Sequence, residues 1–268
     1  HGRSAKYLEY LEKEVDLQVA CLDGPREVLQ LHLGGGTPTF FSPEHLTQLI
    51  QGILDQAEVA PQHEFSFEGH PNNTTREHLQ ALHDLGFRRV SYGVQDYNEA
   101  VQKAIHRIQP YEHVERATLW AREIGYTSIS HDLVFGLPFQ SLDDVLHTIQ
   151  QTTRLMPDRL AFYSYAHVPW IKGNGQRGFK DADVPKDEMK RRCYEEGKKQ
   201  LLAQGFSVTH QLPRRLSPRF QGKEGKGDIG EFVIHHRAGD AGRQIFRLVA
   251  QLLARLIKLL QHLGRRGL

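Results

Sequence analysis

Cysteine is almost absent from this sequence. Only Cys21 and Cys193 occur among 268 residues, and neither lies in a CxxC or CxxxCxxC spacing. Two isolated thiols form neither a disulfide framework nor a metal-binding cage. Such scarcity is typical of a reducing compartment, and we expect a cytoplasmic protein.

Long hydrophobic runs are missing as well. No stretch approaches the roughly 18 consecutive apolar residues that span a bilayer, so no membrane span is predicted. No basic segment followed by an apolar core marks a secretion signal. The chain begins with His1 instead of a methionine and soon enters a helical pattern, so we expect further sequence upstream.

The sequence also lacks a strong excess of charge of either sign, since its formal net charge is +2. This sum conceals an uneven distribution, because acidic residues concentrate in the earlier part of the chain and basic residues near its end. The global charge indicates no polyanionic partner, and no nucleic-acid binding is predicted.

Most of the chain alternates between a helical period and short apolar runs, which is typical of repeated βα units. Ser42 before Pro43, and Thr74 as a capping box with Glu77, predict two helix starts. Alternating units give a parallel sheet, either an open doubly wound sheet or a barrel, and glycine-rich strand ends favour a (β/α) barrel, complete or partial, within an α/β fold. Helices are predicted over residues 5–19, 43–56, 74–85, 114–124, 142–155 and 186–204, and strands over 28–33, 64–68, 89–95, 129–135 and 159–165.

The pattern changes after Gly205. Residues 211–230 are rich in Pro, Gly, Arg and Lys without a period, so we divide the chain into a barrel domain, 1–207, and a divergent basic tail, 208–268. Apolar residues from Ile245 to Leu263 recur at helical spacing, which predicts a terminal amphipathic helix in an otherwise disordered tail. We interpret the tail as a shifted reading frame or an unrelated fusion; the competing hypothesis is a membrane-surface or partner-binding helix.

Reactive groups in parallel βα folds gather at the carboxyl ends of the strands. Each predicted strand delivers polar or glycine residues there. In chain order these are Gly34 to Pro38, then Glu68, Gln95, Asp132, and Ala166 with His167. We therefore expect these residues at one edge of the sheet.

Each of these residues also has a purely structural interpretation. The glycine run suits either a ligand or a tight turn, and Glu68 either a ligand or a salt bridge to a neighbouring strand. Gln95 is equally suited to satisfying backbone groups. Asp132 interrupts a strand expected to be buried, which favours function. Arg107 alone is most simply an exposed cation at the end of a helix, although it suits a carboxylate ligand.

Two other chemistries lack support. The histidines form no ligand pair at a spacing diagnostic of zinc. Neither Ser91 nor Ser164 lies in a nucleophile elbow, so no acyl transfer is predicted.

Taken together, these segments resemble the oxygen-independent coproporphyrinogen III dehydrogenases of the radical S-adenosylmethionine superfamily. The resemblance covers roughly residues 1–206. It rests on LHLGGGTPT at residues 31–39, EFSFE at 64–68, YGVQDYN at 92–98, Val101-Gln102 followed by Arg107, DLVFGLP at 132–138, YAHVP at 165–169 and KDAD at 180–183.

The resemblance implies a site, a cofactor and a fold that lacks its first strand. The positions that contact two S-adenosylmethionine molecules would be Gly35, Gly36, Thr37, Glu68, Gln95, Arg107, Asp132 and Ala166. Family members also hold a [4Fe-4S] cluster on three cysteines of a CxxxCxxC loop. That loop is absent here, and by family order we expect it just upstream of His1.

The implied reaction is oxidative decarboxylation of two propionates of coproporphyrinogen III, giving protoporphyrinogen IX in haem synthesis. The implied partners are the porphyrinogen substrate and an electron donor such as flavodoxin or ferredoxin, acting with a monomeric enzyme. We expect this chain to be an incomplete and inactive portion of such an enzyme. The alternatives are a haem-binding chaperone of the same superfamily without dehydrogenase activity, and an inert remnant.

Overall fold

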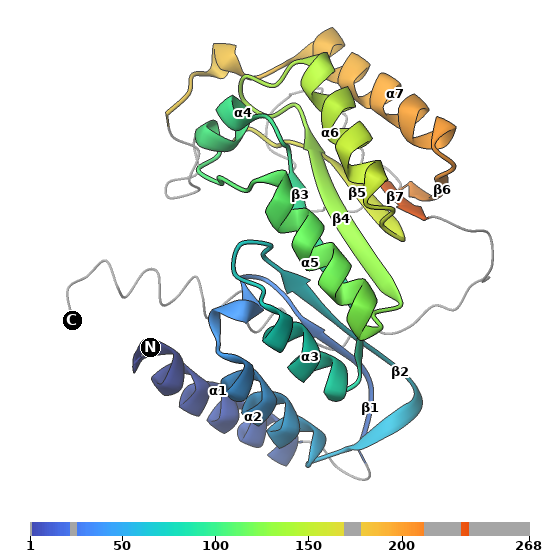
Figure 1. Ribbon diagram of the computed structural model, residues 1–268. Coiled ribbons are helices and arrows are strands. Elements are labelled where there is room, and N and C mark those ends of the chain that lie inside the picture. The colour runs from blue at the N-terminus through green and yellow to red at the C-terminus, as the bar shows by residue number, and fades with distance from the viewer. Residues whose placement is uncertain (1, 22–25, 169–177, 212–231, 236–268) are drawn as a thin grey trace. The chain divides into compact units, whose positions relative to one another are not determined.

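The computed structural model describes residues 2–21, 26–168, 178–211 and 232–235. Within these residues the chain forms two compact units: a first unit of residues up to 92 together with 116–129, and a second unit of 93–115 and the residues from 130 onward. The elements, labelled in Figure 1, are α1 (Gly2–Ala20), β1 (Glu27–Leu33), η1 (Pro38–Phe40), α2 (Pro43–Leu54), β2 (Glu58–Gly69), α3 (Arg76–Asp84), β3 (Phe87–Gln95), α4 (Glu99–Ala104), α5 (Tyr111–Ile124), β4 (Ser128–Phe135), α6 (Leu142–Arg154), β5 (Arg159–Ser164), η2 (Asp181–Asp183), α7 (Asp187–Ala203), β6 (Ser207–Gln211) and β7 (Phe232–His235).

The first unit is built on three parallel strands. β1 pairs with β2, and β2 pairs with β3, so that Leu33 lies beside Phe67 and Phe67 beside Val90. Strand alternation places Phe65 and Phe67 in a core shared with helices α1, α2 and α3. Burying each of these rings contributes about 2–3 kcal/mol. Glu64 and Glu68 consequently occupy the other, more polar face of the sheet.

The second unit has its own core. β4 and β5 pair in parallel, and Leu133 and Phe162 lie in a hydrophobic cluster with side chains of α6 and α7. β7 pairs antiparallel with both β5 and β6. The sequence analysis predicted neither β6 nor β7, because short strands in a segment rich in glycine and charge have no clear two-residue period.

Two helix N-caps predicted from the sequence can be compared with the caps in the structure. Ser42 caps α2, with its hydroxyl accepting a hydrogen bond from the His45 N–H, as predicted. The prediction of a Thr74–Glu77 capping box was wrong. The cap is Thr75, whose partner is the imidazole of His78, because an imidazole nitrogen accepts the N-cap N–H as a glutamate would.

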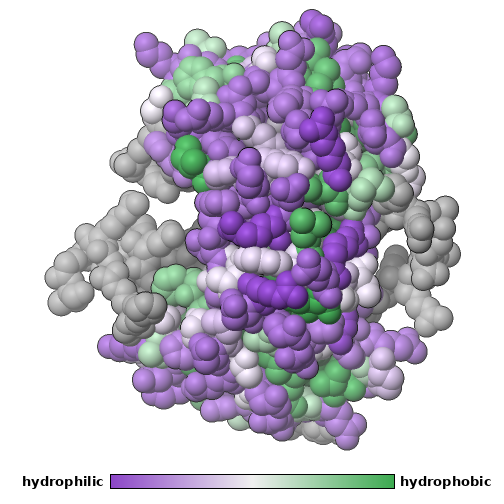
Figure 2. Space-filling model, viewed as in Figure 1, coloured by the Kyte–Doolittle hydropathy of each residue, from purple (hydrophilic) through white to green (hydrophobic). Residues whose placement is uncertain are grey.

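The strands occur in the order β1-β2-β3-β4-β5-β7-β6, and the five predicted βα strands are all present. β6 runs from Ser207 to Gln211 across the expected boundary at residue 207. The predicted terminal amphipathic helix lies outside the described residues, so the division into barrel domain and tail stays a prediction. Among the described residues, no helix is long and apolar enough to cross a membrane. The surface seen in Figure 2 is mainly hydrophilic, with apolar residues scattered across it.

Candidate functional site

In the first unit, the glycine run and Glu68 come together. The run follows β1, and Glu68 lies near the end of β2. The backbone N–H of Gly35, a residue with the left-handed φ of 79°, donates a hydrogen bond to Glu68 Oε2 at 3.1 Å. The parallel pairing of β1 and β2 therefore brings this predicted pair into contact.

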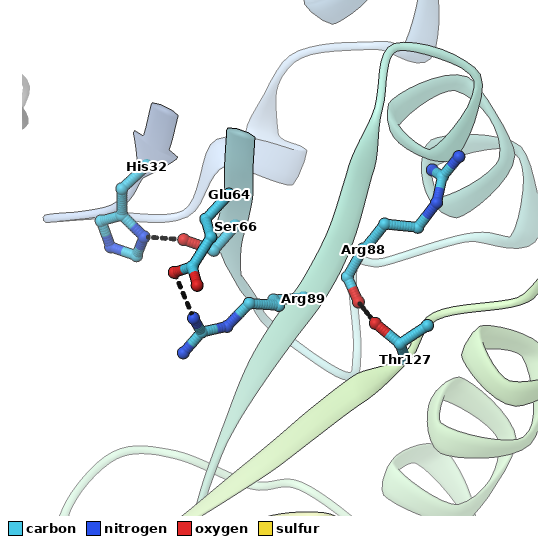
Figure 3. Close-up of polar contacts among 6 residues, drawn as sticks. All are labelled: His32, Glu64, Ser66, Arg88, Arg89 and Thr127. Atoms are coloured by element: carbon cyan, nitrogen blue, oxygen red, sulfur yellow. Dashed lines mark hydrogen bonds and ion pairs between the residues drawn. The ribbon is translucent and has the colours of Figure 1, made fainter. Parts of the chain in front are cut away.

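Two further residues, which the sequence interpretation missed, complete this cluster. The His32 ring lies 3.6 Å from Glu68 Oε1 through Nε2 and 2.8 Å from Ser66 Oγ through Nδ1; Figure 3 shows the His32–Ser66 contact between β1 and β2. The nearby His32 ring and then the hydrogen bond from the Gly35 N–H lower the pKa of Glu68, against the opposing effect of partial burial. The available signal was the two-residue spacing of His32 from Gly34 and of Ser66 from Glu68, since residues so spaced share a strand face.

The absence of a side chain at Gly34 lets the ends of two side chains approach the backbone closely. A Cβ built there would lie 2.5 Å from His32 Nε2 and 2.8 Å from Glu68 Oε1. Gly35 and Gly36 are exposed and Thr37 is half-buried, and the Thr37 side chain forms no capping hydrogen bond to η1. The backbone of this turn thus lies beside the Glu68 carboxylate.

The two acids of β2 have different roles. Glu64 accepts a hydrogen bond from Arg89 Nη1 of β3 at 2.8 Å, the cross-strand ion pair visible in Figure 3. Glu68 makes its contacts with His32 and Gly35 instead. Both acids therefore lie beside a basic side chain of a neighbouring strand, Glu64 beside Arg89 of β3 and Glu68 beside His32 of β1. The ligand interpretation of Glu68 stays a prediction.

In the second unit, Gln95 and Arg107 gather around the backbone of Gly93. Arg107 Nη2 donates to the Gly93 carbonyl at 2.8 Å. A Cβ on Gly93 would lie 2.7 Å from Gln95 Nε2 and 2.9 Å from Arg107 Nη2. Gln95 itself has the left-handed φ of 67°, which costs about 1–3 kcal/mol in a residue other than glycine.

Arg107 is half-buried and reaches back to β3, so the interpretation as an exposed cation at a helix end was wrong. Burial lowers the pKa of its guanidinium, while the negative charge of Asp132 acts in the opposite direction. Its Nε atom is buried and has no hydrogen-bond partner among the described residues. An unsatisfied buried donor of this kind suits a ligand oxygen.

Asp132 and Ala166 complete the residues of the second unit. Asp132 is half-buried on β4 between the buried His131 and Leu133. The expectation of a strand buried on both faces was wrong, because buried and half-buried residues alternate along β4. Ala166 is exposed just beyond β5. Six of the eight predicted residues thus lie at, near or just beyond the end of a strand, whereas Asp132 lies within β4 and Arg107 follows α4.

Comparison with known proteins identifies the family to which this fold belongs. The chain matches the radical SAM superfamily over residues 3–152, more than half of its length, and it belongs to that family. It is 48% identical over 174 residues to the oxygen-independent coproporphyrinogen III oxidase of Helicobacter pylori strain J99, covering 63% of this chain and 37% of the relative. It is 38% identical over 188 residues to the enzyme of that name from Escherichia coli, covering 70% and 41%.

A solved structure agrees. Coproporphyrinogen III oxidase HemN from Escherichia coli, described as a radical SAM enzyme, superposes with a TM-score of 0.72 at 36% identity, over 76% of this chain and 47% of HemN. The match confirms the predicted α/β fold with a partial barrel sheet. The chain spans less than half the length of each of these relatives.

The cysteines of this chain do not fit the family's iron-sulfur cluster. Three thiolates are needed and the sequence has two. Cys21 is exposed after α1, whereas Cys193 is fully buried in the core of the second unit. Burial raises the pKa of the Cys193 thiol, which disfavours the thiolate that binds metal. No reaction step is therefore assigned to a cluster in this chain.

Proposed function

We propose that this chain is the S-adenosylmethionine-binding portion of an oxygen-independent coproporphyrinogen III oxidase. The observation that carries the proposal is the hydrogen bond between Gly35 N and the Glu68 carboxylate at the end of two parallel strands. It joins the two motifs that distinguish the first unit, in a chain whose named relatives share this activity.

The residues present fit the chemical groups of S-adenosylmethionine. An ionised, half-exposed Glu68 accepts hydrogen bonds from an ammonium or from ribose hydroxyls, and the unpartnered Arg107 Nε donates to a carboxylate. In the proposed enzyme the cofactor supplies a deoxyadenosyl radical. The contribution of this chain is to bind and orient the nucleotide, with Gly36, Thr37, Gln95, Asp132 and Ala166 as further contacts.

The complete enzyme is proposed to act on coproporphyrinogen III in the cytoplasm as a monomer. Its electrons would come from a flavodoxin or a ferredoxin. In this chain, which lacks the three cysteines, reconstitution with iron and sulfide is expected to yield no [4Fe-4S] absorption. A reconstituted cluster would contradict that expectation.

Calorimetric titration of S-adenosylmethionine into the full chain tests the proposal. We expect saturable binding at one class of site, weakened at least tenfold by Glu68→Ala. Glu64→Gln is the matched control, because Glu64 lies on the same strand face but pairs with Arg89. Absence of binding by the unaltered chain, or equal loss in both variants, would refute the assignment. Tight haem binding without nucleotide binding would instead support a haem chaperone.

A further inference from the structure

The second unit contains a buried polar cluster that the proposed contacts do not include. Asp96, Gln102, Gln109, Gln140 and Thr148, together the Asp96 network, are each at most 5% exposed. Burying a carboxylate and several amides is unfavourable unless every group is hydrogen-bonded. This cluster includes the residue that follows Gln95 and a residue hydrogen-bonded to Arg107, so its presence needs an explanation.

The Asp96 carboxylate is fully engaged. Oδ2 accepts from Gln140 Nε2 at 2.7 Å and from the Thr148 hydroxyl at 3.2 Å. Oδ1 accepts from the backbone N–H of Asn98 at 2.6 Å. Burial raises the pKa of Asp96 to about 6, and the negative charge of Asp144 on α6 acts in the same direction. Three donors facing one side chain require an acceptor that carries two oxygens.

Gln140 has only one possible orientation. Its Oε1 accepts from the N–H groups of Gly136 and Leu137, at 2.7 and 3.1 Å. Its Nε2 must therefore face Asp96 and the Val134 carbonyl, 3.0 Å away. One amide thus ties the turn after β4, the strand that carries Asp132, to the residue that follows Gln95.

The amides of Gln102 and Gln109 extend the network to Arg107. Gln102 Nε2 donates to the carbonyls of Asp96 and Gln109, at 2.9 and 2.8 Å. The Gln109 side chain donates to the Gly93 carbonyl at 3.0 Å, the same oxygen that Arg107 Nη2 contacts. The backbone N–H of Arg107 in turn donates to the Gln102 carbonyl at 2.9 Å. Arg107 is held at both its backbone and its guanidinium.

We propose that Asp96 and Gln140 are positioning residues, which hold Gln95 and Arg107 in the conformation that binds the nucleotide. The left-handed φ of Gln95 supports this, because a strained backbone persists only where its surroundings over-determine it. Gln95 is flanked by a hydrogen bond from Asp96 N to the Val94 carbonyl at 3.0 Å. The inference rests on the proposed function, since it concerns the same nucleotide.

Exchanging the donor and the acceptor of the hydrogen bond from Gln140 to Asp96 tests the direct coupling between these two residues. In Gln140→Glu two carboxylates face each other, and in Asp96→Asn an amide group faces the donors of the network. In the double variant, the new carboxylate at position 140 still accepts from Gly136 and Leu137, while the new amide at position 96 donates to it. We expect each single variant to weaken S-adenosylmethionine binding at least tenfold. The double variant should recover part of the loss, though not all, because Val134 loses its donor.

The readouts separate positioning from general stability. Calorimetric stoichiometry reports the folded fraction, and the dissociation constant reports the site. Hydrogen exchange at Gly136 and Leu137 should accelerate in the single variants and slow again in the double variant. Asp143→Asn and Gln150→Glu on exposed positions of α6 are the matched controls, with unchanged affinity expected.

Thr148→Val, which removes one donor to Asp96 without changing the side-chain shape, replaces the single variants if they fail to fold; a loss of about threefold in affinity is then expected. Equal affinity in all variants, or a double variant as weak as the product of the single effects, would overturn the inference alone. Failure of the unaltered chain to bind the nucleotide would overturn the proposed function and this inference with it.

Discussion

The two units support their candidate residues in opposite ways. In the first unit, Glu68 is half-exposed and held by a backbone N–H and an imidazole, so its pKa is lowered. In the second unit, Gln95 precedes Asp96 in the chain and Arg107 is connected to Asp96 through Gln102. The carboxylate of Asp96 is fully buried and its pKa is raised. Both arrangements present polar groups near strand ends. Only in the second unit do these groups adjoin a buried hydrogen-bond network.

This difference shows where binding residues get their rigidity. A carboxylate on a glycine turn is oriented locally, by neighbours within β1 and β2. Glutamine and arginine have longer, more flexible side chains. Their rotamers must be restricted by hydrogen bonds to neighbouring residues, because the loss of rotamer entropy on binding otherwise weakens the affinity. We therefore expect substitutions in the first unit to affect the ligand more than the fold, and substitutions in the Asp96 network to affect both.

The largest effect is expected from Gln140→Leu. This change leaves the Asp96 carboxylate and the Gly136 N–H without their buried partner and should lower the free energy of unfolding by about 3 kcal/mol. Glu68→Gln in the first unit should lower it by no more than about 1 kcal/mol, because Glu68 is half-exposed. Urea unfolding of both variants makes the comparison; equal losses would remove the distinction between the units.

The two regions should also respond to pH with opposite signs. The pKa of Asp96 is about 6 in the folded chain against an ordinary 3.8, so its contribution to stability is greatest below about pH 4 and is lost as the pH rises through 6. The difference corresponds to about 3 kcal/mol. The lowered pKa of Glu68 acts the other way, giving stability above its unfolded pKa that is lost on acidification.

Urea unfolding between pH 3 and pH 7.5 measures both contributions. Subtracting the Asp96→Asn profile from that of the unaltered chain isolates Asp96, and the difference should fall as the pH rises. The same subtraction with Glu68→Gln should give a smaller difference that grows with pH. Parallel profiles for the unaltered chain and Asp96→Asn would show that Asp96 is not the titrating group.

The sequence predicted most of the fold because βα units are local. The period of two in β2 places Phe65 and Phe67 on one face of the strand, and the structure buries both. The residues 35 and 68 were placed at strand ends by pattern alone, and their contact follows from parallel pairing. β6 and β7 were missed because they are short and their pairing joins segments distant in the chain.

The supporting residues were harder to predict, for a physical reason. His32 and Gln140 act through contacts between different elements. Two-residue spacing indicates the strand face of His32 but not its partner on β2, and the residues around Gln140 do not indicate Asp96. Asp96 lies in one of the segments on which the resemblance rests, but the sequence alone does not distinguish a buried aspartate from an exposed one. Alternation along β4 could have placed Asp132 on the half-buried face, had the strand not been assumed to be buried on both sides.

A smaller effect, confined to the core of the second unit, is expected from Gly197→Ala. Alanine normally favours a helix by about 1 kcal/mol over glycine. On α7, however, the added Cβ would lie 2.8 Å from the Phe162 ring and 3.1 Å from Ile149, so we expect a net loss of about 1–2 kcal/mol. Gly52→Ala on α2 in the first unit, where the Cβ meets nothing within 4 Å, is the control and should stabilise. Thermal unfolding distinguishes the two signs, and stabilisation by both would show that the α7 contact relaxes freely.

The smallest effect is expected for the exposed ion pair of the first unit. Arg89→Met removes the contact to Glu64, whose two side chains are 32% and 45% exposed, and should change the free energy of unfolding by less than about 0.5 kcal/mol. Affinity for S-adenosylmethionine should stay within twofold, because Arg89 contacts neither Glu68 nor the glycine turn in any described interaction. A tenfold loss of affinity measured by calorimetry would mean that the polar face of the first unit binds the ligand as a whole, and that the local orientation of Glu68 is an incomplete account of it.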